Sequence, residues 1–105
     1  MKIIIIYGGV SMTLALVGGM DRLEKEYRRI AEEHKCHLKV IPKVCPKYIA
    51  KIQGVDCIIM CTNMVSHKIA KSIVKEAKGA EIPLVRNHSS GLSTFTKTVR
   101  SLCGV

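Results

Sequence analysis

The amino-acid sequence predicts a three-layer α/β/α domain of the Rossmann or flavodoxin type, with a mainly parallel sheet of four strands and one extra strand at the N-terminus. Three observations lead to this prediction. The 105 residues suffice for one hydrophobic core but not for two. From residue 13 onward, apolar runs alternate with segments of helical periodicity in the order βαβαβαβα. No linker or repeat divides the chain, so residues 1–105 form one domain, with 1–12 as the extra strand and its turn and 13–105 as the core.

Each predicted strand is a short run of β-branched and other apolar residues. Residues 2–7 (KIIIIY) suit a strand that extends the sheet edge or pairs with a second chain. The four core strands are expected at residues 13–17, 37–41, 55–61 and 82–85. Because parallel strands need right-handed crossovers, helices are expected on both faces of the sheet.

Each predicted helix follows a strand and begins at a recognisable residue. Asp21 is expected to cap the first helix, with Glu24 completing a capping box. Cys45-Pro46 is expected to start a short second helix. Ser66 is expected to cap the third helix, and Ser89 or Ser90 the fourth.

The composition is strongly basic, with 17 Lys and Arg against 8 Asp and Glu and a formal net charge of +9. This excess favours anionic partners, whether nucleic acid, phosphorylated ligands or acidic surfaces. Aromatic residues make up only 4% of the chain, which argues against a surface that stacks bases. One helix face nevertheless carries a row of lysines that would suit phosphates or, more commonly, is simply solvated: Lys68, Lys71, Lys75 and Lys78.

The apolar runs are far shorter than the roughly 20 residues of a membrane helix, and no signal peptide is recognisable. The five cysteines are odd in number and lack C-x-x-C spacing, so they are interpreted as reduced thiols of a cytoplasmic protein. A homodimer is expected, because a small domain with an apolar edge strand tends to cover it.

Ligands of open parallel sheets bind beyond the carboxyl ends of the strands, where helix N-termini supply N–H groups. The residues that follow the predicted strands are small, polar or basic, and a charged Arg86 there would suit a phosphate or carboxylate. The predicted ligand-binding residues are Gly18, Gly19, Asn63, Ser66, His67, Arg86, His88, Ser89 and Ser90. Each also has a plainer interpretation, since Gly18 and Gly19 suit a tight turn and the serines suit helix caps.

A metal or haem site is a second interpretation of the same region. Cys61, His67 and His88 would supply soft or imidazole ligands near the strand ends, whereas Cys57 suits the core. Their spacing matches no known metal motif. Paired carboxylates, a phosphate-binding loop and a nucleophile–base pair are not recognisable either, so an enzyme is the less expected class.

The segments 14–43, 54–78 and 82–95 resemble the bacterial domain-of-unknown-function family 2325. The motifs that carry the resemblance are Val17-Gly18-Gly19, Tyr27-Arg28, Asp56, Val65-Ser66-His67 and the segment 86–90. The chain departs from the family pattern at Pro42-Lys43-Val44, where the family has a His- and Gly-rich strand ending. The resemblance implies no particular activity and leaves cofactor binding, haem in particular, open.

Three hypotheses follow, with a binding domain favoured over an enzyme. The first is recognition of a small anionic ligand or cofactor at the strand ends. The second is haem or metal binding through Cys61, His67 and His88, and the third is nucleic-acid binding through the lysine row.

Overall fold

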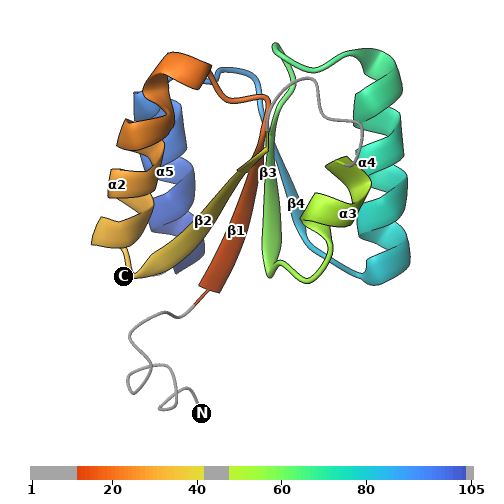
Figure 1. The fold of residues 1–105 in the computed structure, drawn as a ribbon, viewed down its shortest axis with the longest axis horizontal. Helices are drawn as coiled ribbons and strands as arrows, with labels where there is room; N and C mark the ends of the chain where they lie inside the picture. The colour runs from red at the N-terminus through yellow and green to blue at the C-terminus, as the bar shows by residue number, and fades with distance from the viewer. Residues whose placement is uncertain (1–11, 42–47, 104–105) are drawn as a thin grey trace.

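The computed structural model describes residues 12–41 and 48–103, which form a sheet between two helical layers (Figure 1). The sheet has four strands in the order β2-β1-β3-β4, and every neighbouring pair is parallel. The strands are β1 (Met12–Val17), β2 (Cys36–Ile41), β3 (Cys57–Cys61) and β4 (Leu84–Asn87). The predicted α/β fold with a parallel sheet is therefore confirmed, while the predicted strand at 2–7 lies outside the described residues.

One helical layer holds α2 (Glu24–Glu33) and α5 (Leu92–Cys103), and the other holds α3 (Tyr48–Ile52) and α4 (His67–Ala80) (Figure 1). The chain leaves β1 toward β2 through α2 and leaves β3 toward β4 through α4, on the opposite face. The direction of winding thus reverses between β1 and β3, which makes this the topological switch point of the sheet. No helix in residues 12–41 or 48–103 is long and apolar enough to cross a bilayer.

Two hydrophobic cores lie on the two faces of the sheet. Alternate residues of the central strands supply them, so Leu14 and Leu16 face one core while Ala15 and Val17 face the other. All five residues of β3 are buried, as expected for a strand covered on both faces. Tyr27 and Phe95 join α2 to α5 through a T-shaped ring contact with centroids 5.0 Å apart.

The first two core strands lie within one residue of their predicted bounds, but β4 runs from Leu84 to Asn87 instead of 82–85. The end of α4 explains the shift. Glu81 has a left-handed backbone, and the Ile82 N–H donates to the Ala77 carbonyl in a Schellman motif. Because Ile82 completes the helix end and Pro83 has no N–H, the strand begins at Leu84.

The predicted capping box at Asp21 and Glu24 is wrong. Residues 21–23 form a 3₁₀ turn, and neither this turn nor α2 has a side-chain cap. The Tyr27 hydroxyl instead accepts from the Met20 N–H at 3.1 Å, while Glu24 pairs with Arg28 one turn along the helix. The predicted Ser66 cap is confirmed, since Ser66 Oγ accepts from the Ile69 N–H at 3.2 Å.

The cysteines depart in part from the expectation of reduced thiols. Cys57 and Cys61 are free and buried, as that expectation requires. Cys36, in contrast, is disulfide-bonded. The predicted second-helix start at Cys45-Pro46 lies outside the described residues.

Candidate functional site

The switch point between β1 and β3 is filled by protein atoms. Gly18 has a φ of +86°, and a Cβ added there would lie 2.8 Å from Val65 Cγ2 and 2.9 Å from the Cys61 carbonyl oxygen. A Cβ at Gly19 would lie 2.9 Å from both Leu16 and Tyr27. Both glycines are buried, so the missing side chains allow the chain to pack against itself.

A cavity of about 510 Å³ lies on the α4 side of the sheet, beside β3 and the edge strand β4. Its apolar walls are Met60, Val65, Ala70 and Val74, and Thr62 adds one hydroxyl. Its basic side chains are His67, Lys71, Lys75, Lys78 and Arg86. The cavity is thus lined by members of two groups that the sequence suggested for different ligands: His67 and Arg86 from the strand ends, and Lys71, Lys75 and Lys78 from the lysine row.

Helical and strand periodicity explain why these basic groups converge. Lys71, Lys75 and Lys78 are spaced by four and three residues, so they follow one face of α4. Arg86 is in register with Met60, and directly paired residues of a sheet project from the same face. Arg86 therefore points to the α4 side. Its predicted position beyond the strand is wrong, because it lies within β4.

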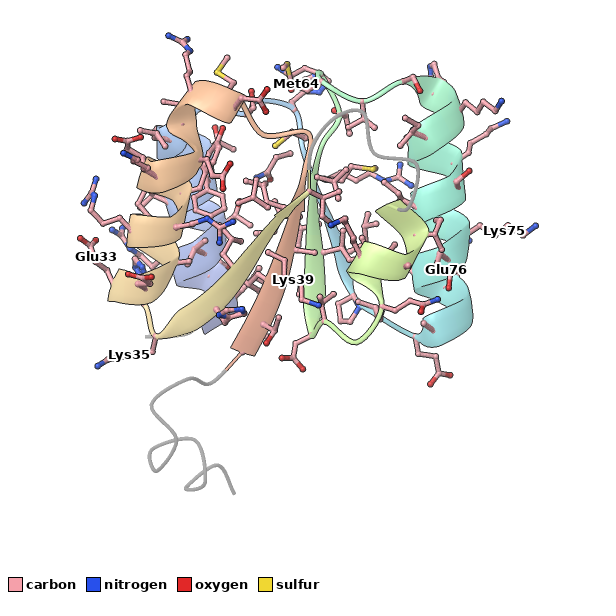
Figure 2. All side chains as sticks on the ribbon, viewed as in Figure 1. Glu33, Lys35, Lys39, Met64, Lys75 and Glu76 are labelled. Carbon is pink, nitrogen blue, oxygen red and sulfur yellow. The ribbon has the colours of Figure 1, made fainter. Side chains whose placement is uncertain are left out.

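The cavity has no acidic lining residue among those that the structure describes. The two salt bridges found in residues 12–41 and 48–103 both lie on α2, where Arg28 pairs with Glu24 and Arg29 with Glu33. Glu76 accepts a hydrogen bond from Gln53, the residue just after α3, and Figure 2 shows Glu76 on α4 apart from the outward-pointing Lys75. The cavity is therefore a concentration of unneutralised positive charge, which favours an anion.

Thr62 connects the cavity to the loop after β4. Its N–H donates to the Asn87 carbonyl at 2.8 Å, and its hydroxyl lies 3.2 Å from His88 Nδ1. His88 does not line the cavity itself, but it contacts Thr62, which does. The Asn87 side chain turns to the other face, where its Nδ2 donates to Thr98 Oγ1 of α5 at 3.0 Å.

A family model described as "Uncharacterized protein conserved in bacteria (DUF2325)" matches residues 13–102. The chain belongs to this family. The match spans nearly all of the core that the sequence predicted, and it confirms the family that the resemblance indicated. No curated protein and no solved structure matches the chain.

The motifs of this DUF2325 domain contact one another in the fold. Gly18 packs against Val65, which brings the VGG motif onto the V-S-H motif. The Tyr27 hydroxyl donates to the Ser90 carbonyl at 2.5 Å, and burial raises the pKa of Tyr27. Asp56 holds the start of β1, since its Oδ2 accepts from the Thr13 N–H at 2.7 Å. Much of the family pattern in this chain therefore serves the fold.

The serines predicted for ligand binding also have local roles. Ser66 caps α4, and Ser89 Oγ accepts from the Gly91 N–H at 3.0 Å. Ser90 is 2% exposed, and its Oγ has no hydrogen-bond partner within the described residues. Since α5 begins at Leu92, neither Ser89 nor Ser90 occupies its N-cap position. Asn63 is exposed in the loop after β3.

The structure does not bring Cys61, His67 and His88 together as metal or haem ligands. Cys61 packs into the core beneath α2 and α5, whereas His67 lines the cavity beside α4. Burial raises the pKa of the Cys61 thiol to about 11, which disfavours the thiolate that binds metals. Within residues 12–41 and 48–103, no three His, Cys, Asp or Glu side chains are grouped to hold a metal ion.

Sequence reasoning missed the apolar part of the cavity. Ala70 and Val74 pack against the core on the α4 side of the sheet, and both also line the cavity. Their alternation with Lys71 and Lys75 is the signal that marks an amphipathic wall. This pattern alone does not show whether the helix face lines a cavity or simply meets solvent, because that depends on what lies beside β4.

Proposed function

We propose that this chain is a small binding domain that takes an anionic small molecule into the cavity between α4 and β4. The observation that carries the proposal is the set of basic side chains around an apolar floor, with no carboxylate among the described lining residues. A volume of about 510 Å³ lies in the usual range of small-molecule sites. Lysine and arginine are the residues that bind phosphate and carboxylate groups.

The sequence predicted an anionic ligand beyond the carboxyl ends of the strands, and we now place that ligand in the cavity between α4 and β4. Of the residues predicted to bind it, His67 and Arg86 line the cavity. Lys71, Lys75 and Lys78 join them from the row first considered for nucleic acid. Binding is favoured over catalysis, because the His67 imidazole has no carboxylate beside it among the described lining residues to form an acid–base pair.

Isothermal titration calorimetry of the full chain with inorganic pyrophosphate tests the proposal. We expect Arg86→Gln and Lys71→Gln each to weaken binding by about tenfold or more, because each removes a charge-assisted hydrogen bond. Lys97→Gln is the matched control, since Lys97 is exposed on α5 on the other face of the sheet. Unchanged binding by Arg86→Gln, or an equal loss in Lys97→Gln, would contradict the proposal.

Nucleic-acid binding is a second candidate, favoured by Lys68, which is exposed and continues the row beyond the cavity lining. This candidate predicts that Lys68→Gln weakens binding of a single-stranded oligonucleotide, with affinity falling steeply between about 50 and 200 mM salt. The cavity proposal predicts that the same substitution leaves pyrophosphate binding unchanged. The two measurements together separate the candidates.

A homodimer and a cytoplasmic location are further proposals. The dimer is supported by the apolar run at residues 2–7, and sedimentation equilibrium of the full chain with Ile4→Lys tests it. A dimer that persists unchanged in this variant would exclude pairing through residues 2–7.

The cytoplasmic location is supported by the free thiols of Cys57 and Cys61. The disulfide at Cys36 argues against a fully reducing compartment.

A further inference from the structure

We infer that the anion bound beside α4 is the diphosphate ester of a hydrocarbon chain, and that the hydrocarbon lies in a second hollow along β4. This inference rests on the proposed function and names the ligand class of that site. The cavity continues along the edge of the sheet into a second hollow.

The second hollow, of about 440 Å³, shares Val74, Lys78 and Arg86 with the cavity. Its other walls are largely apolar and consist of Ala77, Ile82, Pro83 and Leu84, with Glu81 as the one further charged residue among them. A ligand long enough to occupy both spaces would pass the two shared basic residues. The two hollows together therefore form one groove with a basic part and an apolar part.

The course of the chain shows how these parts are arranged. β4 follows α4 through the short segment 81–83, so the end of the helix lies near the start of the strand. Thr62 and His67 thus mark the carboxyl end of the sheet, whereas Ile82 and Leu84 mark the opposite end of the groove. A charged head between Lys71 and Arg86 would leave an attached chain to run past Lys78 toward Leu84.

The charge and the surface of the groove select the ligand class. Lys71, Lys75, Lys78 and Arg86 are four cationic side chains around one space, which match a diphosphate better than a single carboxylate. The described walls contain no Phe, Tyr or Trp ring on which a nucleobase would stack, and the imidazole of His67 is the one aromatic group among them. Ala77, Ile82 and Leu84 offer apolar contact only, which suits a hydrocarbon.

The groove is open because β4 is the edge strand of the described sheet. The Pro83 carbonyl accepts from the Ile58 N–H of β3, and the Asn87 carbonyl accepts from the N–H of Thr62 just after β3. By alternation, the backbone groups of Leu84 and Arg86 therefore point outward. A second copy placed along this edge would bring its own α4 lysines toward Lys75 and Lys78. That repulsion favours an anionic ligand over self-association at this edge.

Three probes test the inference by calorimetry on the full chain: inorganic pyrophosphate, geranyl diphosphate and ADP. We expect geranyl diphosphate to bind about tenfold or more tightly than pyrophosphate, since each buried methylene contributes about fourfold in affinity. The affinity for ADP should exceed that for pyrophosphate by a smaller factor than the affinity for geranyl diphosphate does. Arg86→Gln should weaken binding of all three probes.

A pair of variants on one strand locates the hydrocarbon. Leu84 packs on the α4 side of β4, and Val85 packs on the opposite face. Leu84→Thr should remove most of the advantage of geranyl diphosphate while leaving pyrophosphate binding unchanged, whereas Val85→Thr should alter neither. If thermal melting shows that Leu84→Thr does not fold, Ile82→Thr replaces it, because Ile82 lines the same hollow.

The outcomes separate the inference from the proposed function. Equal binding of pyrophosphate and geranyl diphosphate overturns the hydrocarbon assignment but leaves the anion site in place. Tighter binding of ADP than of geranyl diphosphate overturns it in favour of a nucleoside. The hydrocarbon assignment is also overturned if Leu84→Thr still binds geranyl diphosphate more tightly than pyrophosphate by the same factor as the unchanged chain. If none of the three probes binds, the anion site itself is contradicted.

Discussion

Gly18 and Gly54 share a left-handed backbone but differ in what surrounds them. Their φ angles are +86° and +81°, yet an added Cβ would overlap Val65 and Cys61 at Gly18 and would meet nothing within 4 Å at Gly54. The comparison separates two reasons for a glycine: backbone conformation alone, and conformation together with close packing. At Gly18 both reasons apply, because the turn after β1 lies directly against the turn after β3.

This contrast gives a prediction for two alanine substitutions. Gly18→Ala should lower the free energy of unfolding by about 2–4 kcal/mol, because backbone strain and steric overlap add. Gly54→Ala should lower it by only about 1 kcal/mol, because strain acts alone. Urea denaturation monitored by circular dichroism measures both values. Equal losses in the two variants would show that Val65 and Cys61 adjust freely to the added methyl group.

At the scale of elements, the ends of helices determined which predictions succeeded. Ser66 was predictable because an N-cap depends on one side chain and its next neighbours along the chain. The cap of the first helix was not, because the Tyr27 hydroxyl that binds the Met20 N–H is seven residues away and is positioned by packing. The start of β4 was missed for a related reason, since α4 continues past Gly79 to Ala80 and its C-terminal motif extends to Ile82.

The end of α4 leads to a second prediction. Glu81 occupies the left-handed position of the Schellman motif with a φ of 58°, where glycine is the usual residue. Glu81→Gly should therefore raise the free energy of unfolding by about 0.5–1 kcal/mol. Glu81→Gln is the control for the lost charge and should give no comparable gain, because glutamine has the same strain. A stability loss in Glu81→Gly, measured by urea denaturation, would argue that strain at this position is negligible.

At the scale of the whole molecule, the sequence predicted the parallel sheet and its helical layers because hydrophobic periodicity records both. It did not predict the strand order, which places β1 and β3 in the centre and leaves β4 at an edge. The position of the cavity depends on that order. A site at the switch point follows from general rules for such sheets, but in this chain Val65 fills the space beside Gly18, and the hollow lies beside β4.

The distribution of charge leads to the last prediction, which concerns salt. The chain has a formal net charge of +9, and Lys71, Lys75, Lys78 and Arg86 surround one cavity. Salt screens this mutual repulsion and so stabilises the fold. Salt also weakens the ion pairs Arg28–Glu24 and Arg29–Glu33, but these pairs are exposed and contribute little to the free energy of unfolding. Raising NaCl from about 20 to 200 mM should therefore increase the free energy of unfolding measured with urea.

Two double variants that remove the same charge show whether the cavity causes this dependence. Lys75→Gln with Lys78→Gln removes two positive charges from the cavity, and Lys97→Gln with Arg100→Gln removes two from α5 on the other face. If repulsion is concentrated at the cavity, the first pair should reduce the stabilisation by salt more than the second, because nearby like charges repel most strongly. Equal reductions would assign the effect to net charge alone, and an anion would then gain no special advantage from binding beside α4.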